Sequence, residues 1–296
     1  MIYYTHDESR HNRKDHPALI ETQGDLNMLN DKIALIGAGK MAGAIALGLV
    51  NKGIPATQLC AYDPSPEAAE KFAELTGAVC TATMKDALKD AGIVLLAVKP
   101  QYAKAAFDEA REHLGGKLLI SIAAGLSISK LTQLSGGIER IIRVMPNTPA
   151  LVGEGMSCFC SAAGATEDDL KKAEEILSAF GLCRKVPESM LDAVTGLSGS
   201  GPAYVFEFIM ALADGGVYAG LPRDAAIELA AQTVFGSALM VLKRGKDHPA
   251  VLRDAVISPG GTTARGVAAL DGGAFRSIVM KAVIAATERS AELGKQ

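Results

Sequence analysis

The sequence predicts an α/β domain built on a parallel sheet, followed by an all-α domain, and three observations lead to this prediction. From Lys32 onward, short apolar runs rich in β-branched residues alternate with segments of helical periodicity, which is typical of a sheet covered by helices on both faces. A glycine-rich turn follows the first run. From about Met190 the strand signals stop, and only helical patterns remain.

The alternation assigns the elements of the first domain in chain order. Apolar runs predict the strands "KIALIGAG", "QLCAYD", "AGIVLLAVKP", "KLLISIAAG" and "RIIRVMPN". Helical periodicity predicts the intervening helices "KMAGAIALGLVNKG", "SPEAAEKFAELTG", "QYAKAAFDEAREHL" and "ISKLTQLSGG". Two further strands, "GMSCFCSA" and "CRKVPE", flank the helix "TEDDLKKAEEILSAFG", whose start is marked by Thr166 and an acidic first turn.

Glycine and proline divide the second domain into helices. These are expected over residues 202–219, 222–244, 248–257, 262–270 and 274–294. The chain is therefore expected to have three parts. The N-terminal extension is polar and lacks the apolar run of a secretory signal, so we expect it to be disordered. The three predicted parts are an extension over 1–30, an α/β domain over 31–189 and an all-helical domain over 190–296.

Composition indicates a globular protein that acts on a small molecule. Of 296 residues, 49% are hydrophobic and 21% are charged, which excludes a disordered or fibrous chain. The net charge is only −3 and no sustained basic face is apparent, so neither nucleic acid nor a membrane is expected as a partner. Five cysteines without a CxxC pair favour core packing over a metal or redox site, and a cytoplasmic location.

Two of the predicted helices are too apolar to be covered on one side only. The segments 222–244 and 274–294 are apolar over more than one stripe, so each must be buried on several faces. Either a second subunit covers these helices or they form the core of their own domain. The first alternative predicts a homodimer that assembles through the C-terminal helices.

The stretch "IALIGAGKMAGA" predicts a site for a dinucleotide. Gly37, Gly39 and Ala42 form G-x-G-x-x-A between a strand and a helix that opens with Lys40 and Met41. The first glycine allows a tight turn, the second lets the backbone approach a pyrophosphate, and the alanine permits close helix packing. Helix N–H groups favour phosphate. We therefore expect a Rossmann-type domain that binds NADPH or NADH.

Asp63 allows two interpretations. It ends the second predicted strand, where an acidic residue binds the adenosine ribose in many NAD-dependent domains. Alternatively, Asp63 only starts the turn before Pro64 or caps the helix at Ser65. No arginine stands beside it to bind a 2′-phosphate. Both interpretations remain open.

Two later strand ends carry small residues or proline at the edge where open α/β sheets bind their ligands. We expect both loops to line the nicotinamide side of the cofactor; the alternative is that they are ordinary connections. The residues expected to contact the cofactor there are Val98, Lys99, Pro100, Ala123, Ala124 and Gly125.

The catalytic inventory favours reduction of a C=N bond. Alcohol oxidation needs a general base, but outside the extension the only histidines are His113 and His248, and neither is placed as one. An imine needs orientation and charge complementarity instead. In "SPGGTTARG", glycines expose N–H groups at a helix start, and Ser258, Thr262 and Thr263 add hydroxyls. This stretch predicts a site for a small carboxylate, unless it is only a turn between helices.

The sequence resembles the pyrroline-5-carboxylate reductase family from about Lys32 to the last helix. The stretches that carry the resemblance are "GAGKMAGAI", "RVMPNTPALVGEG", "GLSGSGPAYVF" and "LRDAVISPGGTTARGVAALD". It implies NADPH- or NADH-dependent reduction of the cyclic imino acid 1-pyrroline-5-carboxylate to L-proline, the last step of proline biosynthesis. It also implies a helical domain interleaved with that of a partner subunit, in homodimers that can assemble into a larger ring.

The resemblance also assigns roles in the site. Thr263 is expected near the ring nitrogen of the substrate, as the catalytic residue. Near the substrate carboxylate the resemblance places Ser258, Gly260, Gly261 and Thr262. The residues expected to shape the nicotinamide pocket are Met145, Pro146 and Asn147.

Two other functions fit the same domain plan. A β-hydroxyacid dehydrogenase uses a lysine of its helical domain for acid–base chemistry, and Lys243, Lys246 and Lys281 are candidates, although each also suits a solvated position. A module that binds NAD(P) without catalysis is the third possibility. The sequence does not decide between NADPH and NADH.

Overall fold

The computed structural model describes residues 29–294 except 244–246, and these form two compact units. The first, called here the sheet unit, consists of residues 29–207 together with 274–294. The second, called the helical unit, is the described part of residues 208–273. Each unit is described by itself.

The predicted parts of the chain relate to these units in different ways. All but the last two residues of the predicted extension, 1–30, lie outside the described residues. The predicted boundary at residue 189 stays a prediction. The two compact units are divided after Glu207. Residues 191–199 belong to the sheet unit together with the last helix of the chain, which packs on them.

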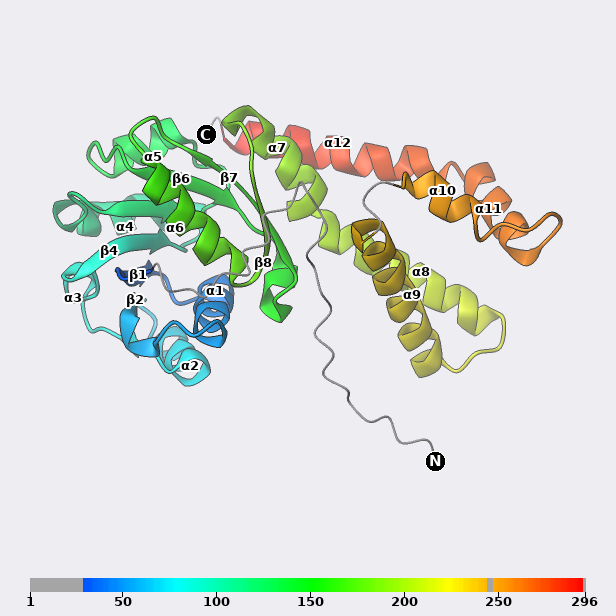
Figure 1. The fold of residues 1–296 in the computed structure, drawn as a ribbon, viewed down its shortest axis with the longest axis horizontal. Coiled ribbons are helices and arrows are strands. Elements are labelled where there is room, and N and C mark those ends of the chain that lie inside the picture. The colour runs from blue at the N-terminus through cyan, green and yellow to red at the C-terminus, as the bar shows by residue number, and fades with distance from the viewer. Residues whose placement is uncertain (1–28, 244–246, 295–296) are drawn as a thin grey trace. The chain divides into compact units, whose positions relative to one another are not determined.

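An eight-stranded sheet forms the centre of the sheet unit, with strand order β3-β2-β1-β4-β5-β6-β7-β8 (Figure 1). The strands are β1 (Lys32–Ile36), β2 (Leu59–Tyr62), β3 (Val79–Cys80), β4 (Ala91–Leu96), β5 (Leu118–Ser121), β6 (Ile141–Met145), β7 (Gly155–Ser161) and β8 (Gly181–Lys185). The chain turns to one side of β1 and then to the other, as in doubly wound sheets, so a crevice for ligands is expected where β1 and β4 meet.

One strand pair departs from the expected parallel order. β7 pairs with β6 in antiparallel orientation, and β8 then pairs with β7 in parallel. Between β6 and β7 lies only a short connection containing the 3₁₀ turn η3 (Thr148–Val152), whereas a parallel return needs a crossover of a dozen or more residues. The strand itself was predicted, but apolar patterning carries no information about direction.

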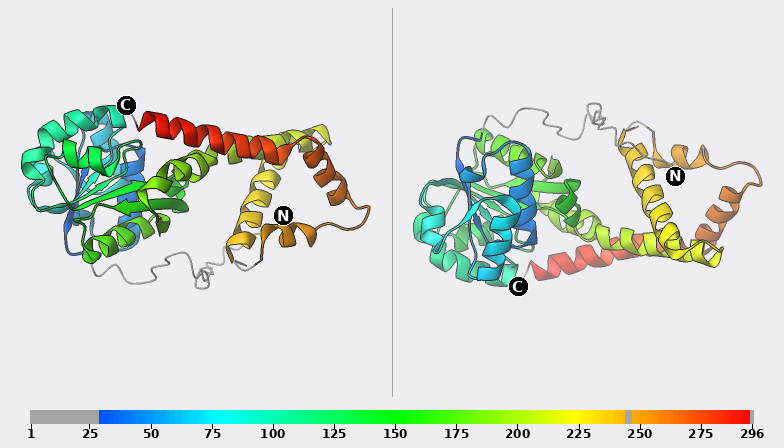
Figure 2. Two further views of the ribbon diagram at one scale, coloured as in Figure 1. Left: turned by 90° about the horizontal axis from the view of Figure 1, so that it is seen from above. Right: turned by 90° about the horizontal axis from the view of Figure 1, so that it is seen from below.

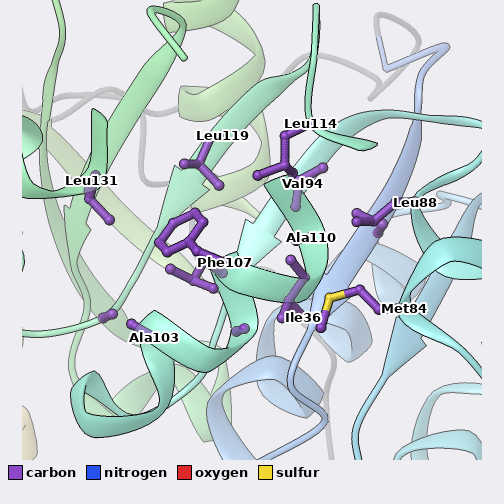
Figure 3. Packing of buried hydrophobic residues seen from close by; sticks show 14 of the residues in the cluster. Ile36, Met84, Leu88, Val94, Ala103, Phe107, Ala110, Leu114, Leu119 and Leu131 are labelled. Carbon is purple, nitrogen blue, oxygen red and sulfur yellow. The ribbon is translucent and has the colours of Figure 1, made fainter. Parts of the chain in front are cut away.

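Helices cover both faces of the sheet (Figure 1). On one face α3, α4 and α5 enclose a core around Phe107, which lies against the sheet near Leu119 and Val94 (Figure 3). α1 and α6 cover the other face. The helices around the sheet are α1 (Lys40–Asn51), α2 (Pro66–Thr76), α3 (Met84–Leu88), α4 (Pro100–Ala110), α5 (Ile128–Leu134) and α6 (Glu167–Ser178). The 3₁₀ turns η1 (Ala56–Gln58), η2 (Arg111–His113) and η4 (Glu188–Met190) lie between these elements.

The start of α6 is fixed by a buried ion pair. Thr166 caps the helix and forms a capping box with Asp169, as the sequence predicts for the cap. The side chain of Asp169 is fully buried, and its carboxylate also accepts a hydrogen bond from Arg140 Nε at 3.0 Å and a second one from Nη2. Burial opposes ionisation of this carboxyl, but the hydrogen bonds from Arg140 and Thr166 outweigh it and hold its pKa at about 2.

The last helix of the chain belongs to the sheet unit. α12 (Phe275–Leu293), the red helix in Figure 2, packs on α7 (Leu191–Val194) and on a π-helical turn, η5 (Thr195–Gly199). At Gly196 the approach is so close that a Cβ would overlap the Thr287 hydroxyl of α12. The expected helix over 274–294 therefore forms, while α7 and η5 were not predicted.

The helical unit has little core of its own. It contains most of α8 (Gly201–Tyr218), which begins in the sheet unit, together with α9 (Arg223–Lys243), α10 (Pro249–Asp254) and α11 (Thr262–Gly272). Its buried apolar residues are Ala213, Ala226 and Ala230, with Ile209 and Val217 packed against them. By length and composition α9 could also cross a membrane, and only 11% of its apolar window is buried. Such a helix needs a covering surface.

Candidate active site

The turn after β1 has the geometry that the glycine pattern predicts. Gly37 has a φ of +98°, which residues with a side chain rarely adopt, and a Cβ there would lie 2.9 Å from the carbonyl oxygen of Ala97. The Gly37 N–H donates to the carbonyl of Tyr62 at 2.8 Å. The turn is thus held between the ends of β2 and β4, and no other residue fits at Gly37 without moving it.

Beside this turn, helix α1 presents open backbone. Gly39 is the N-cap of α1, and no side chain caps the helix among the described residues. The first turn of a helix has N–H groups without intrahelical acceptors, and here the first bonded one is Gly43, which donates to Gly39 at 2.9 Å. A Cβ on Gly39 would meet no atom within 4 Å. Lys40 is exposed and Met41 half-buried. These residues fit the pyrophosphate of NAD(P)H.

Asp63 is placed at the end of β2, next to the glycine turn. Its Oδ2 accepts a hydrogen bond from the backbone N–H of Ala38 at 2.8 Å, and its Oδ1 accepts one from the N–H of Ser65 at 2.9 Å. Ser65 itself caps α2 through its hydroxyl. Asp63 therefore does form the turn that leads to Ser65, as one of the two interpretations predicted, and it also binds the backbone of the glycine turn. A contact with ribose stays a prediction.

The predicted cofactor loops meet at one edge of the sheet. β1, β4, β5 and β6 are parallel, so the segments that follow them share the edge of the glycine turn. Hydrogen bonds tie neighbouring loops to the strands: the Ala97 N–H donates to Ile36 at 2.8 Å, and the Ile122 N–H donates to Leu96 at 3.0 Å. Exposed or half-buried residues at this edge are Val98, Lys99, Pro100, Ala124 and Gly125, whereas Ala123 is buried.

Asn147 is positioned by two hydrogen bonds, one to each end of its side-chain amide. Its Oδ1 accepts from the N–H of Met156 at 2.9 Å, and its Nδ2 donates to the carbonyl of Ser198 at 3.1 Å. Met145 packs against the same turn, because its Cε lies 2.5 Å from the place of a Cβ on Gly199. Asn147 and Met145 therefore join the end of β6 to η5. Pro146 between them is buried.

Glu188 is a residue of this edge that sequence reasoning missed. Its Oε1 accepts from the backbone N–H of Ile128 at 2.7 Å and from Arg143 Nη1 at 2.9 Å. It thereby fixes the loop after β5 to β6. The two partners are 60 and 45 residues away along the chain, so no local pattern indicates the contact.

The "SPGGTT" stretch forms a tight turn into a helix in the helical unit. The Gly261 N–H donates to the Ser258 carbonyl at 3.0 Å, and Gly260 has a φ of +67°. Gly261 is the N-cap of α11, again without a side-chain cap among the described residues, and Thr262 and Thr263 are its first residues. Thr263 is half-buried, and Ser258, Gly260 and Thr262 are exposed. The helix begins where the sequence predicts, and its open N–H groups and hydroxyls can bind a carboxylate.

The other candidate residues lie in ordinary structural positions. His248 caps α10 through Nδ1, which accepts from the Ala250 N–H at 3.2 Å, and His113 ends η2. Lys243 and Lys281 are exposed, and Lys246 lies outside the described residues. All five cysteines are free, and burial raises the pKa of Cys160 and Cys183 to about 11. In the described part of the chain, no group of three or more His, Cys, Asp or Glu residues could hold a metal ion.

A doubly wound sheet with a glycine turn at its first strand, and a second unit of helices with a polar helix start, define a two-domain NAD(P)-dependent oxidoreductase. Residues 188–293 match the family model for pyrroline-5-carboxylate reductase dimerisation, and residues 32–125 match a model described as NADP oxidoreductase, coenzyme F420-dependent. The chain belongs to the pyrroline-5-carboxylate reductase family.

Individual relatives support this over nearly the whole chain. Pyrroline-5-carboxylate reductase of Arabidopsis thaliana is 48% identical over 266 residues, which are 89% of this chain and 96% of the relative. The solved structure of the reductase from Coxiella burnetii has a TM-score of 0.83 at 34% identity and covers 89% of this chain and 98% of that one. The Plasmodium falciparum pyrroline carboxylate reductase, solved with NADP bound, has a TM-score of 0.81 at 37% identity, over 90% and 98% of the two chains. The resemblance and the fold class are thus confirmed.

Proposed function

We propose that this chain catalyses the NAD(P)H-dependent reduction of 1-pyrroline-5-carboxylate to L-proline in the cytoplasm. The observation that carries the proposal is the "SPGGTT" turn at an uncapped helix start, in a chain whose family membership extends over both units. Bound NAD(P)H supplies the hydride for the C=N carbon of the substrate. The groups of the chain then have to bind and orient the two molecules.

In this proposal the backbone N–H groups of Thr262 and Thr263, at the uncapped start of α11, bind the substrate carboxylate, and the hydroxyl of Ser258 adds a third donor. Hydrogen bonds to a charged group contribute roughly 1.5–3 kcal/mol each, and the helix terminus about 0.3–1 kcal/mol more. Two or three such contacts account for the roughly 4–8 kcal/mol of millimolar to micromolar binding. The hydroxyl of Thr263 binds and orients the ring nitrogen of the substrate.

The cofactor is proposed to bind along the edge of the sheet. The turn from Gly37 to Gly39 and the start of α1 hold the pyrophosphate, and the loops after β4 and β5 line the nicotinamide side. Asn147 and Met145 act by fixing the neighbouring η5 turn. The site residues assigned from the sequence remain proposals in these roles.

The direct test is turnover. Purified protein is mixed with 1-pyrroline-5-carboxylate and with NADH or NADPH, and the nicotinamide absorbance is followed. We expect a rapid decrease that needs both substrates. Cofactor binding without turnover would overturn the proposal in favour of a non-catalytic NAD(P)-binding module. Turnover of a β-hydroxyacid that is lost when Lys243 or Lys281 is replaced would favour the dehydrogenase.

Replacing Thr263 with alanine should lower kcat/KM for 1-pyrroline-5-carboxylate by roughly ten- to hundredfold, because one hydrogen bond to the reacting ring is lost. The affinity for the cofactor should stay unchanged, since only the substrate contact is removed. Thr57→Ala, which removes an exposed hydroxyl from η1 in the sheet unit, serves as the control. A Thr263→Ala enzyme within twofold of wild type would remove this residue from its role.

We further propose that the chain forms a homodimer through its C-terminal helices. In the single chain, α9 buries only Ala226 and Ala230, while Ile227, Leu229 and Phe235 are about half exposed. None of the residues of α12 is buried. Apolar area of this extent on helices marks an interface. The alternative, that these helices form the core of their own domain, is disfavoured because so few of their residues are buried in the single chain.

Replacing Phe235 with aspartate should convert the assembly into monomers, because a charge would be buried at the interface without a partner. The mass in solution, measured by sedimentation equilibrium, checks this. Leu75→Asp, at a similarly exposed apolar position on α2, should keep the mass of the wild type. A Phe235→Asp protein that assembles like the wild type would place the interface elsewhere.

A further inference from the structure

The carboxylate of Asp63 is immobilised at the point where the adenosine ribose of a dinucleotide meets the end of the second strand. Both of its oxygens accept backbone N–H groups, Oδ2 that of Ala38 and Oδ1 that of Ser65. The residue is half-buried and cannot swing away without breaking one of these bonds. The glycine turn therefore carries a fixed negative charge at its side.

The same contacts remove the donors that a phosphate would need. A 2′-phosphate is bound by backbone N–H groups, hydroxyls and basic side chains. Here the backbone N–H groups of Ala38 and Ser65 are both taken by Asp63. The stretch "LCAYDPSP" that surrounds Asp63 contains no lysine, arginine or histidine.

The negative charge of Asp63 also affects a thiol on the neighbouring strand β3. Cys80 in β3 is partly buried, and burial together with the nearby Asp63 carboxylate raises the pKa of its thiol. A phosphate brought to the same place would meet this charge in a partly desolvated setting, where repulsion between like charges is poorly screened. A ribose hydroxyl, in contrast, donates a hydrogen bond to a carboxylate.

We infer that Asp63 makes this chain selective for NADH over NADPH, by accepting a hydrogen bond from the ribose 2′-hydroxyl and by occupying the donors and the place of a 2′-phosphate. The inference deepens the proposed function and rests on it for the identity of the reaction. It concerns binding of the cofactor and can be measured without turnover.

The test is isothermal titration calorimetry of the full chain with NADH and with NADPH. The wild type should bind NADH about tenfold or more tightly than NADPH, the size of one charge-assisted hydrogen bond. Asp63→Ser should bring the two dissociation constants to within about threefold of each other, through weaker NADH binding and stronger NADPH binding. Asp63→Asn, which keeps the shape of the side chain and loses its charge, should give a ratio of the two dissociation constants between those of the wild type and of Asp63→Ser.

The ratio of the two affinities separates selectivity from a merely structural role. If Asp63 only stabilises the glycine turn, its replacement should weaken the binding of NADH and of NADPH by the same factor. An unchanged ratio of the two affinities would therefore overturn the inference. Equal affinities in the wild type would do the same. Ser65→Ala is the control, because it removes the α2 cap but keeps the backbone N–H that Asp63 accepts, so its ratio should match the wild type.

Turnover measured in parallel distinguishes the two proposals. Preferential NADH binding without reduction of 1-pyrroline-5-carboxylate would refute the proposed function and leave the inference about Asp63 standing. Reduction with equal kcat/KM for both cofactors, together with equal affinities, would establish the function and refute the inference.

Discussion

Replacing Gly37 with alanine is expected to weaken NADH binding about a hundredfold and to destabilise the sheet unit. The left-handed conformation at φ +98° costs a residue with a Cβ roughly 1–2 kcal/mol, and that Cβ would lie 2.9 Å from the Ala97 carbonyl oxygen. The turn must shift to relieve this contact. A shift that loses one or two hydrogen bonds to the pyrophosphate accounts for the expected change in affinity.

Replacements at two other glycines separate the effect of backbone conformation from the effect on pyrophosphate binding. Gly53 has a φ of +95° but open space around it, so Gly53→Ala measures the cost of conformation alone, seen as a drop in Tm without a change in affinity. Gly39 has an ordinary φ and open space, so Gly39→Ala should keep its Tm and lose affinity only because of the pyrophosphate. If Gly37→Ala retained wild-type affinity for NADH, the glycine turn would not be the cofactor site.

Replacing Asp169 with asparagine should lower the free energy of unfolding by about 2–3 kcal/mol at pH 7. The carboxylate is fully buried and paired with Arg140, and removal of one partner of such a pair leaves the other uncompensated. The estimate is below the range for fully buried pairs because about a third of the Arg140 side chain is exposed. Urea denaturation followed by circular dichroism provides the measurement.

The loss should depend on pH in a defined direction. The pKa of Asp169 is about 2 in the folded chain and near 3.9 in an unfolded one, so its contribution is complete above about pH 4 and disappears as the pH falls toward 2. Wild type and Asp169→Asn should therefore converge at low pH. Asp168→Asn, at the exposed neighbouring position, should cost less than about 1 kcal/mol. A constant difference between pH 7 and pH 2.5 would contradict the role of ionisation.

Local signals were sufficient for most of the fold. Apolar runs and helical spacing indicated the long elements, Thr166 marked the start of α6, and the glycine pattern placed the turn after β1. The short elements β3 and α3 escaped, because two and five residues are too few for a periodic pattern. The antiparallel direction of β7 follows from a short connection and not from the composition of the strand.

The site was less predictable than the fold, because its contacts are long-range. The sequence left the role of Asp63 undecided, and only the structure shows that it accepts the N–H of Ala38, 25 residues away. Glu188 and the amide of Asn147 join strand ends to segments far along the chain, and no spacing rule encodes such pairs. Residue types indicated the chemistry, whereas the supporting hydrogen bonds required tertiary structure.

The return of α12 to the sheet unit has a consequence for biosynthesis. Residues 208–273 interrupt that unit in the sequence, so its last helix leaves the ribosome only after the whole helical unit has been made. At roughly 5–20 residues per second, the nascent sheet unit waits for several seconds without α12, with the pocket for it beside Gly196 uncovered. A chain interrupted in that interval would leave α7 and η5 without the helix that packs on them, so the sheet unit is completed only after the helical unit has been made.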